Sequence, residues 1–193
     1  MVGMAAFPHL AALAVRLLAL EPSCGPVRIV AVDGPSAAGK STFAARLSGA
    51  LDGAPVVHSD DFPVPWDGDP LAWWRPVAEQ VLTPLRAGRP GRFRRYDWRR
   101  GVFAEEIEIP VAPILIIEGV GAARQEAPAA FRIWVEAPHG VRRRRAAVRG
   151  DDLAAWDRWT RSEEKLFATD RTSERADLKI AGNGQEATGP IPR

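Results

Sequence analysis

The sequence predicts an α/β fold built on a parallel β-sheet, and three observations support this prediction. Apolar segments of strand length recur along the chain, at 27–32, 54–58, 114–117 and 131–135. Most of them are separated by segments whose apolar residues repeat at helical spacing. Acidic or glycine-rich residues follow several of these strands directly. Strands that alternate with helices form parallel sheets with right-handed crossovers, and such sheets bind ligands at the carboxyl ends of their strands.

The first helix is predicted over residues 8–20, where Leu10, Leu13 and Leu17 repeat at helical spacing. Prolines and a glycine between 22 and 26 end this helix and lead into the first strand, 27–32. That strand is apolar and rich in β-branched residues, apart from Arg28.

Residues 34–42 read Gly-Pro-Ser-Ala-Ala-Gly-Lys-Ser-Thr and fit the phosphate-loop motif G-x-x-x-x-G-K-S/T. A strand precedes the motif and a helical segment follows it, which is the context that a phosphate-binding loop requires. Glycines let the backbone fold tightly, so that its N–H groups converge on phosphate oxygens. We therefore expect a bound nucleoside triphosphate, ATP, with Mg²⁺. The expected nucleotide-binding residues are Gly34, Ala37, Ala38, Gly39, Lys40, Ser41 and Thr42. Lys40 would reach the β- and γ-phosphates, and the Ser41 hydroxyl would bind Mg²⁺.

The middle of the chain is predicted to hold a short buried strand at 54–58, an irregular stretch at 63–70 and a helix at 73–86. Pro84 is expected to kink or end that helix. Residues 92–110 alternate as half-exposed strands do, and 94–98 could pair with 106–109 in a small hairpin outside the main sheet.

The rest of the chain is predicted to contain a central parallel strand at 114–117, which Glu118 and Gly119 follow, and another strand at 131–135. A basic helix at 139–148, a second helix at 153–168 and a last strand at 177–181 come next. Residues 1–182 are then one domain with a hairpin insert at 92–110 and a lid at 139–150. The polar tail, 183–193, is expected to be disordered.

Composition narrows the classes of protein to consider. With 193 residues, of which 46% are hydrophobic, the chain suits one buried domain. All but three of its 26 basic residues are arginine and the net charge is only +2, so base composition can explain the basic balance and no nucleic-acid partner is expected. The single cysteine, Cys24, fits a reducing compartment. Leu10 to Leu20 is too short for a membrane span, so we expect a cytoplasmic enzyme.

Acidic residues follow three of the predicted strands, at the edge where the phosphate loop lies. Glu118 is placed to help bind Mg²⁺, although it could be an ordinary carboxylate at a strand end. Asp60 is placed to accept a proton from a substrate hydroxyl, although it could simply cap a turn or helix. Asp33 and Asp61 are expected to be structural.

The basic helix carries Arg142 to Arg145 and Arg149, which would form a mobile lid that stabilises charge on the transferred group. Arg145 and Arg149 are the candidate catalytic arginines. A solvated basic helix is the alternative.

Aromatic residues divide into two groups. Trp134, Trp156 and Trp159 lie in regular elements and are expected in the core. A second group could form a wall for a planar substrate, with core packing equally plausible for two of its members, Trp73 and Trp74. The group comprises Trp66, Trp73, Trp74, Tyr96 and Trp98. His58 is expected to be structural.

These residues together resemble the uridine kinase/phosphoribulokinase family of P-loop kinases, over about residues 27–182. The resemblance is carried by Gly34–Ser41, Asp60-Asp61-Phe62, the run Val81-Leu82-x-Pro84-Leu85-x-x-Gly88, Tyr96-Asp97-Trp98, Glu118-Gly119 and the arginine-rich lid. It implies a five-stranded parallel core with a substrate-binding hairpin and a lid. It also implies that Asp60 is the catalytic base, that Glu118 helps hold Mg²⁺, that Tyr96 lies against the substrate, and that Asp69 or Asp67 binds ribose hydroxyls.

Two departures fall on nucleobase recognition. The family has a histidine that reads the pyrimidine where this chain has Gly101, which follows Arg99 and Arg100. The family usually has tyrosine where this chain has Pro63. The resemblance therefore implies kinase chemistry more strongly than it implies uridine as the acceptor.

The leading hypothesis is an ATP-dependent kinase of a small-molecule hydroxyl, with the 5′-hydroxyl of a nucleoside as the first acceptor to consider. A kinase of a non-nucleoside alcohol, such as a vitamin, sugar or natural product, is the closest alternative. A GTPase switch is disfavoured because the only asparagine, Asn183, precedes glycine, so a guanine-reading Asn-Lys-x-Asp motif is absent. A nucleic-acid-stimulated ATPase is the alternative from another class. The oligomeric state stays open.

Overall fold

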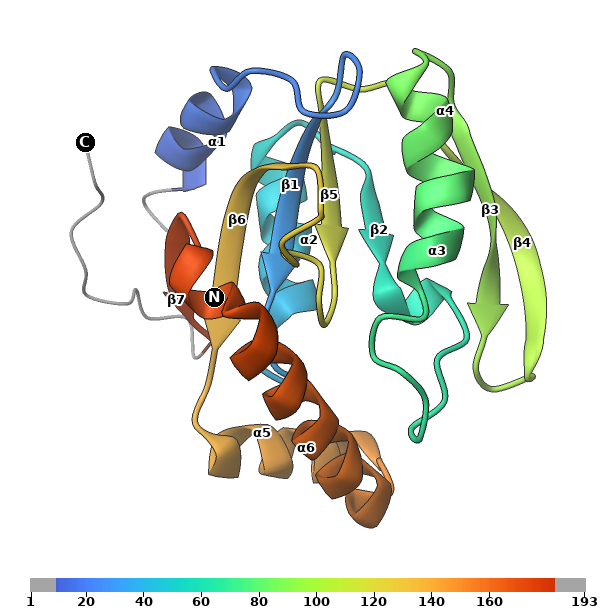
Figure 1. Ribbon diagram of the computed structural model, residues 1–193, viewed down its shortest axis with the longest axis vertical. Coiled ribbons are helices and arrows are strands. Elements are labelled where there is room, and N and C mark those ends of the chain that lie inside the picture. Colours follow the sequence, from blue (N-terminus) through green and yellow to red (C-terminus); the bar gives the residue numbers. More distant parts are fainter. Residues whose placement is uncertain (1–9, 183–193) are drawn as a thin grey trace, which may run out of the picture.

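Parallel strands form the central sheet of this protein, shown as a computed structural model that describes residues 10–182 (Figure 1). In that range the sheet has five strands in the order β2-β5-β1-β6-β7. Their bounds are Arg28–Asp33 for β1, Val56–His58 for β2, Ile114–Glu118 for β5, Ala129–Glu136 for β6 and Leu178–Ala181 for β7. All neighbouring pairs run parallel. The expected α/β fold with a five-stranded parallel core is confirmed.

Helices cover both faces of the sheet. The α-helices of the described residues are α1 (Leu10–Leu18), α2 (Lys40–Ala50), α3 (Trp74–Val77), α4 (Thr83–Arg86), α5 (His139–Arg149) and α6 (Leu153–Asp170). The side chains of β1 alternate between the two faces. Val30 and Val32 belong to the core cluster that contains α1 and α2, and Ile29 and Ala31 belong to the cluster that contains α3 and α4. The carboxyl end of β1 therefore lies between two packed layers.

The helix predicted over 73–86 does not end at Pro84. It runs as α3, a π-helical segment (η2, Ala78–Leu82) and α4, which reaches Arg86. In the π segment the Thr83 N–H bonds to the carbonyl of Ala78, one residue farther back than in an α-helix. The wider turn comes just before Pro84, which lacks an N–H, so the chain stays helical past the proline.

The hairpin is confirmed as a separate two-stranded antiparallel sheet, β3 (Gly91–Asp97) and β4 (Val102–Ile109). Arg94 lies opposite Glu106, within the segments expected to pair. Figure 1 shows the hairpin on the far side of α3 and α4 from the main sheet. Phe93 and Ile109 pack into the same core cluster as α3 and α4, which attaches the hairpin to the domain.

Element ends deviate modestly from the sequence predictions. Strand β6 begins at Ala129 and helix α6 continues to Asp170, both two residues beyond the predicted limits. Residues 8 and 9 of the first helix, and the tail 183–193, lie outside the described residues. Between residues 10 and 182, no helix is long and apolar enough to cross a membrane.

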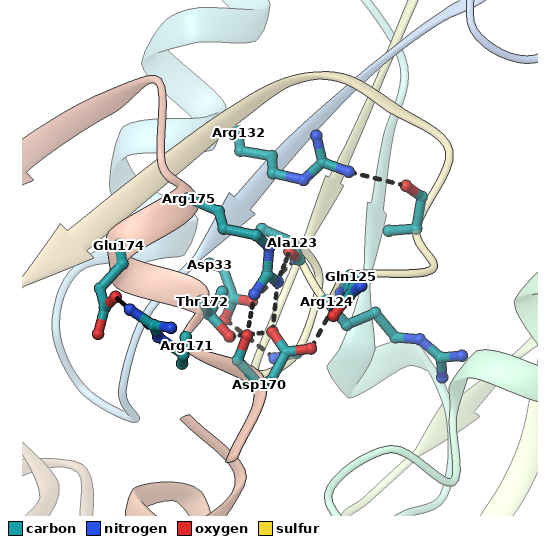
Figure 2. Close-up of polar contacts among 12 residues, drawn as sticks. Asp33, Ala123, Arg124, Gln125, Arg132, Asp170, Arg171, Thr172, Glu174 and Arg175 are labelled. Atoms are coloured by element: carbon teal, nitrogen blue, oxygen red, sulfur yellow. Dashed lines mark hydrogen bonds and ion pairs between the residues drawn. The ribbon is translucent and has the colours of Figure 1, made fainter. Parts of the chain in front are cut away.

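A network of hydrogen bonds braces the carboxyl edge of the sheet (Figure 2). The buried Asp33 carboxylate accepts N–H bonds from Gly34, Gly121 and Ala123, at 2.7, 2.9 and 2.8 Å. Burial raises the pKa of Asp33 to about 7, although these bonds and the charge of Lys40 oppose the rise. Asp33 thus joins the start of the phosphate loop to the segment after β5.

Candidate active site

The phosphate loop, residues 34–39, connects the buried strand β1 to helix α2. Gly34 has φ of 140°, and a Cβ there would lie 2.0 Å from the carbonyl oxygen of Val135. Gly39 has φ of 109° and precedes α2 without a side-chain hydrogen bond to the helix end. The first N–H groups of α2 therefore have no capping side chain, and a helix start of this kind is suited to phosphate. Glycine at these two positions is a geometric requirement of the loop.

Lys40 and Ser41 begin α2 and bring polar groups beneath the loop. Lys40 is only 9% exposed, and its Nζ donates to the carbonyl of Pro35 at 3.2 Å. The Ser41 hydroxyl donates to Glu118 Oε1 at 2.8 Å. The parallel pairing of β1 with β5 brings the Glu118 end of β5 beside the loop.

Glu118 is 3% exposed and is held by two residues from other elements. The same Oε1 that accepts from Ser41 lies 2.8 Å from His58 Nδ1, because β2 pairs with β5 and sets His58 opposite Glu118. Burial acts to raise the pKa of Glu118, but the His58 hydrogen bond and the charge of Lys40 outweigh it and hold the pKa below its ordinary value. The hydrogen bond to Glu118 likewise raises the pKa of His58 against its burial.

Ser41 and Glu118 fit Mg²⁺ as a nucleotide-bound ion. They offer a hydroxyl and a carboxylate oxygen 2.8 Å apart, and hard oxygen donors of this kind suit the ion. No group of three or more His, Cys, Asp or Glu side chains among residues 10–182 could hold a metal alone. Mg²⁺ at nucleotide sites is commonly bound by one or two protein oxygens, with phosphates and waters completing its shell.

A cavity of about 720 Å³ opens over the loop. One part of its wall, here called the donor half, consists of the loop and the residues beneath it. The donor half comprises Ser36, Ala37, Gly39, Lys40, Ser41, Thr42 and Glu118. Ala38 does not line the cavity; it is buried, and its carbonyl accepts from Arg145.

The other part of the wall, here called the acceptor half, is mainly aromatic and apolar. It comprises Phe62, Val64, Trp66, Pro70, Trp73, Trp98, Val120 and Trp159, with Ser59 and Asp60. Trp73 and Trp74 stack with ring centroids 4.9 Å apart, and both are buried. Of these two, only Trp73 also lines the cavity, so Trp73 both packs in the core and forms part of the aromatic wall.

Asp60 and Asp61 are adjacent in sequence but separated in role. The exposed Asp60 lines the cavity, and its carbonyl accepts the Trp98 indole N–H at 2.7 Å. Asp61 is buried and accepts from Arg95 Nε at 3.1 Å. The short 3₁₀ turn η1, Ser59–Asp61, thus turns one carboxylate to the cavity and ties the other to the hairpin.

The basic helix α5 brings Arg145 and Arg149 to the cavity wall. Arg145 Nη1 donates to the carbonyls of Ala37 and Ala38, at 3.1 Å each. Arg149 pairs with Asp151. Arg142 is buried and donates to the carbonyl of Ser36 in the loop and to that of Ala137, just before α5. Arg143 pairs with Asp157, and neither of these two residues lines the cavity.

The comparisons with known proteins are consistent with this geometry. No model of a protein family matches the chain, and no curated protein matches it either. The chain is similar to the structure of a possible uridine kinase from Bacillus stearothermophilus, with a TM-score of 0.65 and 20% identity over 89% of this chain and 96% of that one. It is also similar to a protein from Silicibacter sp. TM1040 that carries the name fructose transport system kinase, with a TM-score of 0.57 and 24% identity over 92% of this chain and 99% of that one. The chain shares the fold of these two proteins.

Within this fold, two expected substrate-binding residues do not line the cavity. Tyr96 packs edge-to-face on Trp98 and Phe103, with centroids 5.1 and 5.4 Å away. Asp69 accepts the backbone N–H of Leu71 at 2.9 Å. Trp98, in contrast, lines the cavity. Tyr96 therefore supports the aromatic wall from behind.

Three residues at the site are ones that the sequence predicts to be structural or does not single out. His58 bonds Glu118, Trp159 lines the cavity, and the buried Glu163 contacts the loop. The signal for Glu163 was present, because it lies four residues after Trp159 and seven after Trp156, on the buried stripe of one helix. A carboxylate on such a buried stripe needs a polar partner, so the sequence can indicate that Glu163 has one, although not which residue it is.

Proposed function

We propose that the protein is an ATP-dependent kinase that transfers the γ-phosphoryl group to a hydroxyl of a small molecule. The observation that carries the proposal is that the phosphate loop, the Ser41–Glu118 pair and Asp60 all open onto one cavity. A triphosphate on the loop and an alcohol against the aromatic wall would meet beside Asp60.

Each residue then has a distinct task. Loop N–H groups and the Lys40 ammonium bind and orient the phosphates, and Arg145 and Arg149 lie where they can stabilise charge on the transferred group. When bound, Mg²⁺ held by Ser41 and Glu118 would neutralise phosphate charge. Asp60 accepts the hydroxyl proton while the substrate oxygen bonds to the γ-phosphorus and the bond to the ADP oxygen breaks. The products are the phosphate monoester and ADP.

The aromatic acceptor half supports a substrate with a planar body, and a nucleoside is the first acceptor to test. Rings of Trp66, Trp98 and Trp159 offer stacking surfaces for such a body. No Asn, Gln or His is among the described residues that line the cavity, and a Cβ at Gly101 would reach only the Tyr96 hydroxyl, at 3.8 Å. The described residues that line the cavity therefore include no amide or imidazole side chain to read the edge of a base, which keeps a non-nucleoside alcohol as the second candidate.

The proposal is tested by incubating purified protein with ATP and Mg²⁺ against nucleosides, sugars and vitamins. ADP release is followed, and mass spectrometry identifies the phosphorylated product. We expect acceptor-dependent ADP release with at least one planar alcohol. Release that no small molecule stimulates, but that DNA or RNA does, would replace the proposal with a nucleic-acid-stimulated ATPase.

A further inference from the structure

Glu163, on α6, is a buried carboxylate outside the phosphoryl-transfer machinery. It is 1% exposed, and both its oxygens lie 3.1 Å from the backbone nitrogen of Ser36 in the phosphate loop. The Ser36 hydroxyl and the Trp159 indole N–H also donate to it. Burying a carboxylate is costly unless hydrogen bonds replace its water. Here three donors from two residues at the cavity wall replace that water.

Side chains from α5 and α6 bind the phosphate loop at three successive residues. The Ser36 N–H and hydroxyl bond to Glu163, and the Ser36 carbonyl accepts from Arg142 Nη1 at 3.4 Å. The next two carbonyls, of Ala37 and Ala38, accept from Arg145. Ala37 has φ of 60°, a left-handed conformation that is unfavourable for a residue with a Cβ. The loop conformation at Ala37 therefore needs support from outside the loop, and α5 and α6 supply it.

Trp159 extends the same contacts into the acceptor half. Its indole N–H, which donates to Glu163, also lies 3.0 Å from the Ser36 hydroxyl oxygen. Its ring meets that of Trp66 edge-to-face, with centroids 5.8 Å apart. Both rings line the cavity. A continuous set of contacts thus runs from the phosphate loop through Glu163 and Trp159 to the aromatic wall.

We infer that Glu163 is a positioning residue, which docks α6 on Ser36 and so holds the phosphate loop in its nucleotide-binding conformation. It would touch no reacting atom. It acts through Ser36 on the nucleotide and through Trp159 on the acceptor. The inference rests on the proposed function for the identity of the nucleotide.

The first test compares Glu163→Gln with Glu164→Gln, which changes the exposed neighbour. Glutamine keeps the shape of Glu163, but it sets an amide N–H₂ group among N–H and O–H donors and removes the charge. We expect Glu163→Gln to weaken binding of Mg²⁺ with the non-hydrolysable analogue AMP-PNP about tenfold in calorimetry. Glu164→Gln is expected to bind as the wild type does. Circular dichroism checks that each variant is folded.

A double-mutant cycle with Ser36→Ala distinguishes an effect of Glu163 on the position of the phosphate loop from an effect on the overall stability of the protein. Ser36→Ala removes the hydroxyl donor, so the loss of nucleotide affinity caused by Glu163→Gln should be smaller in that background. A folded Glu163→Gln protein that binds the analogue as tightly as the wild type, with only a lower melting temperature, would overturn the inference. If Glu163→Gln does not fold, Ser36→Ala alone decides, and unchanged affinity there overturns it. A wild-type protein that does not bind the analogue would instead overturn the proposed function.

Discussion

The donor and acceptor halves of the cavity are built in different ways. The donor half comes largely from one short segment, 34–42, whose shape depends on backbone conformation and on its glycines. The acceptor half is assembled from side chains that are distant in sequence, such as Phe62, Trp98 and Trp159. A site built from backbone groups needs a fixed local sequence motif, whereas a wall of side chains can be made from many combinations of residues. The first kind of site can therefore be predicted from a sequence, and the second is seen only in the folded structure.

The largest expected effect belongs to the donor half. Lys40→Ala should lower turnover by more than about 10²-fold, because it removes the positive charge that the proposed function assigns to the phosphates. The nearly buried Lys40 also bonds the Pro35 carbonyl, so a melting curve is needed to show that the variant is folded. Turnover is measured as ADP release. A folded Lys40→Ala protein with wild-type turnover would remove the loop from catalysis.

Asp60→Asn, at the border of the two halves, should lower kcat by about 10²-fold or more, as expected on losing a general base. ATP affinity should be unchanged, because Asp60 contacts no part of the loop in the hydrogen bonds of the described residues. The matched variant is Asp61→Asn, which loses a buried partner of Arg95 and should reduce stability more than kcat. An unchanged kcat in Asp60→Asn would rule out Asp60 as the general base.

Two aromatic variants sharpen the description of the acceptor half. Trp98 lines the cavity, whereas Tyr96 packs behind it. Trp98→Ala should therefore raise KM for the acceptor about tenfold, the loss of roughly 1.4 kcal/mol of stacking. Tyr96→Ala should raise it less, and neither should change KM for ATP. A larger effect of Tyr96→Ala than of Trp98→Ala would mean that the acceptor lies on the Tyr96 side of the hairpin.

The sequence predicts the fold correctly because helices and strands depend on local patterns, and the loop motif is a local pattern as well. The apolar run at 114–117 and the motif at 34–42 each specify an element within a few residues. The parallel pairing of β1 with β5 then places Glu118 beside Ser41.

The remaining site residues depend on contacts between segments far apart in sequence. Glu163 meets Ser36 across 127 positions, and no local pattern encodes that separation. The contact between His58 and Glu118 is set by the register of β2 on β5, which the sequence does not reveal. Tyr96 was expected against the substrate, but the antiparallel register sets it opposite Phe103, where the two rings pack edge-to-face.

The smallest expected effect on catalysis belongs to the hydrogen-bond network around Asp170 (Figure 2). Asp170, at the end of α6, accepts from the Gln125 N–H, the Thr172 hydroxyl and Arg175, and Arg175 also reaches the carbonyl of Ala123. The same Ala123 donates its N–H to Asp33, so Asp170 supports the segment that Asp33 ties to the phosphate loop. Asp170→Asn should lower the free energy of unfolding by about 1–2 kcal/mol and leave kcat within about threefold.

The pH dependence of that loss tests its electrostatic origin. Burial acts to raise the pKa of Asp170, but the Thr172 and Arg175 hydrogen bonds outweigh it and hold the pKa below its ordinary value. The stabilising contribution is therefore present above the unfolded-state pKa and is lost as the pH falls through the lower folded-state pKa. Urea unfolding of the wild type and Asp170→Asn should show a difference that is full at pH 7 and shrinks below about pH 4. A difference that persists unchanged in acid would mean that Asp170 acts through its shape and neutral hydrogen bonds. A large fall in kcat would mean that the hydrogen-bond network around Asp170 sets the geometry of both halves of the cavity.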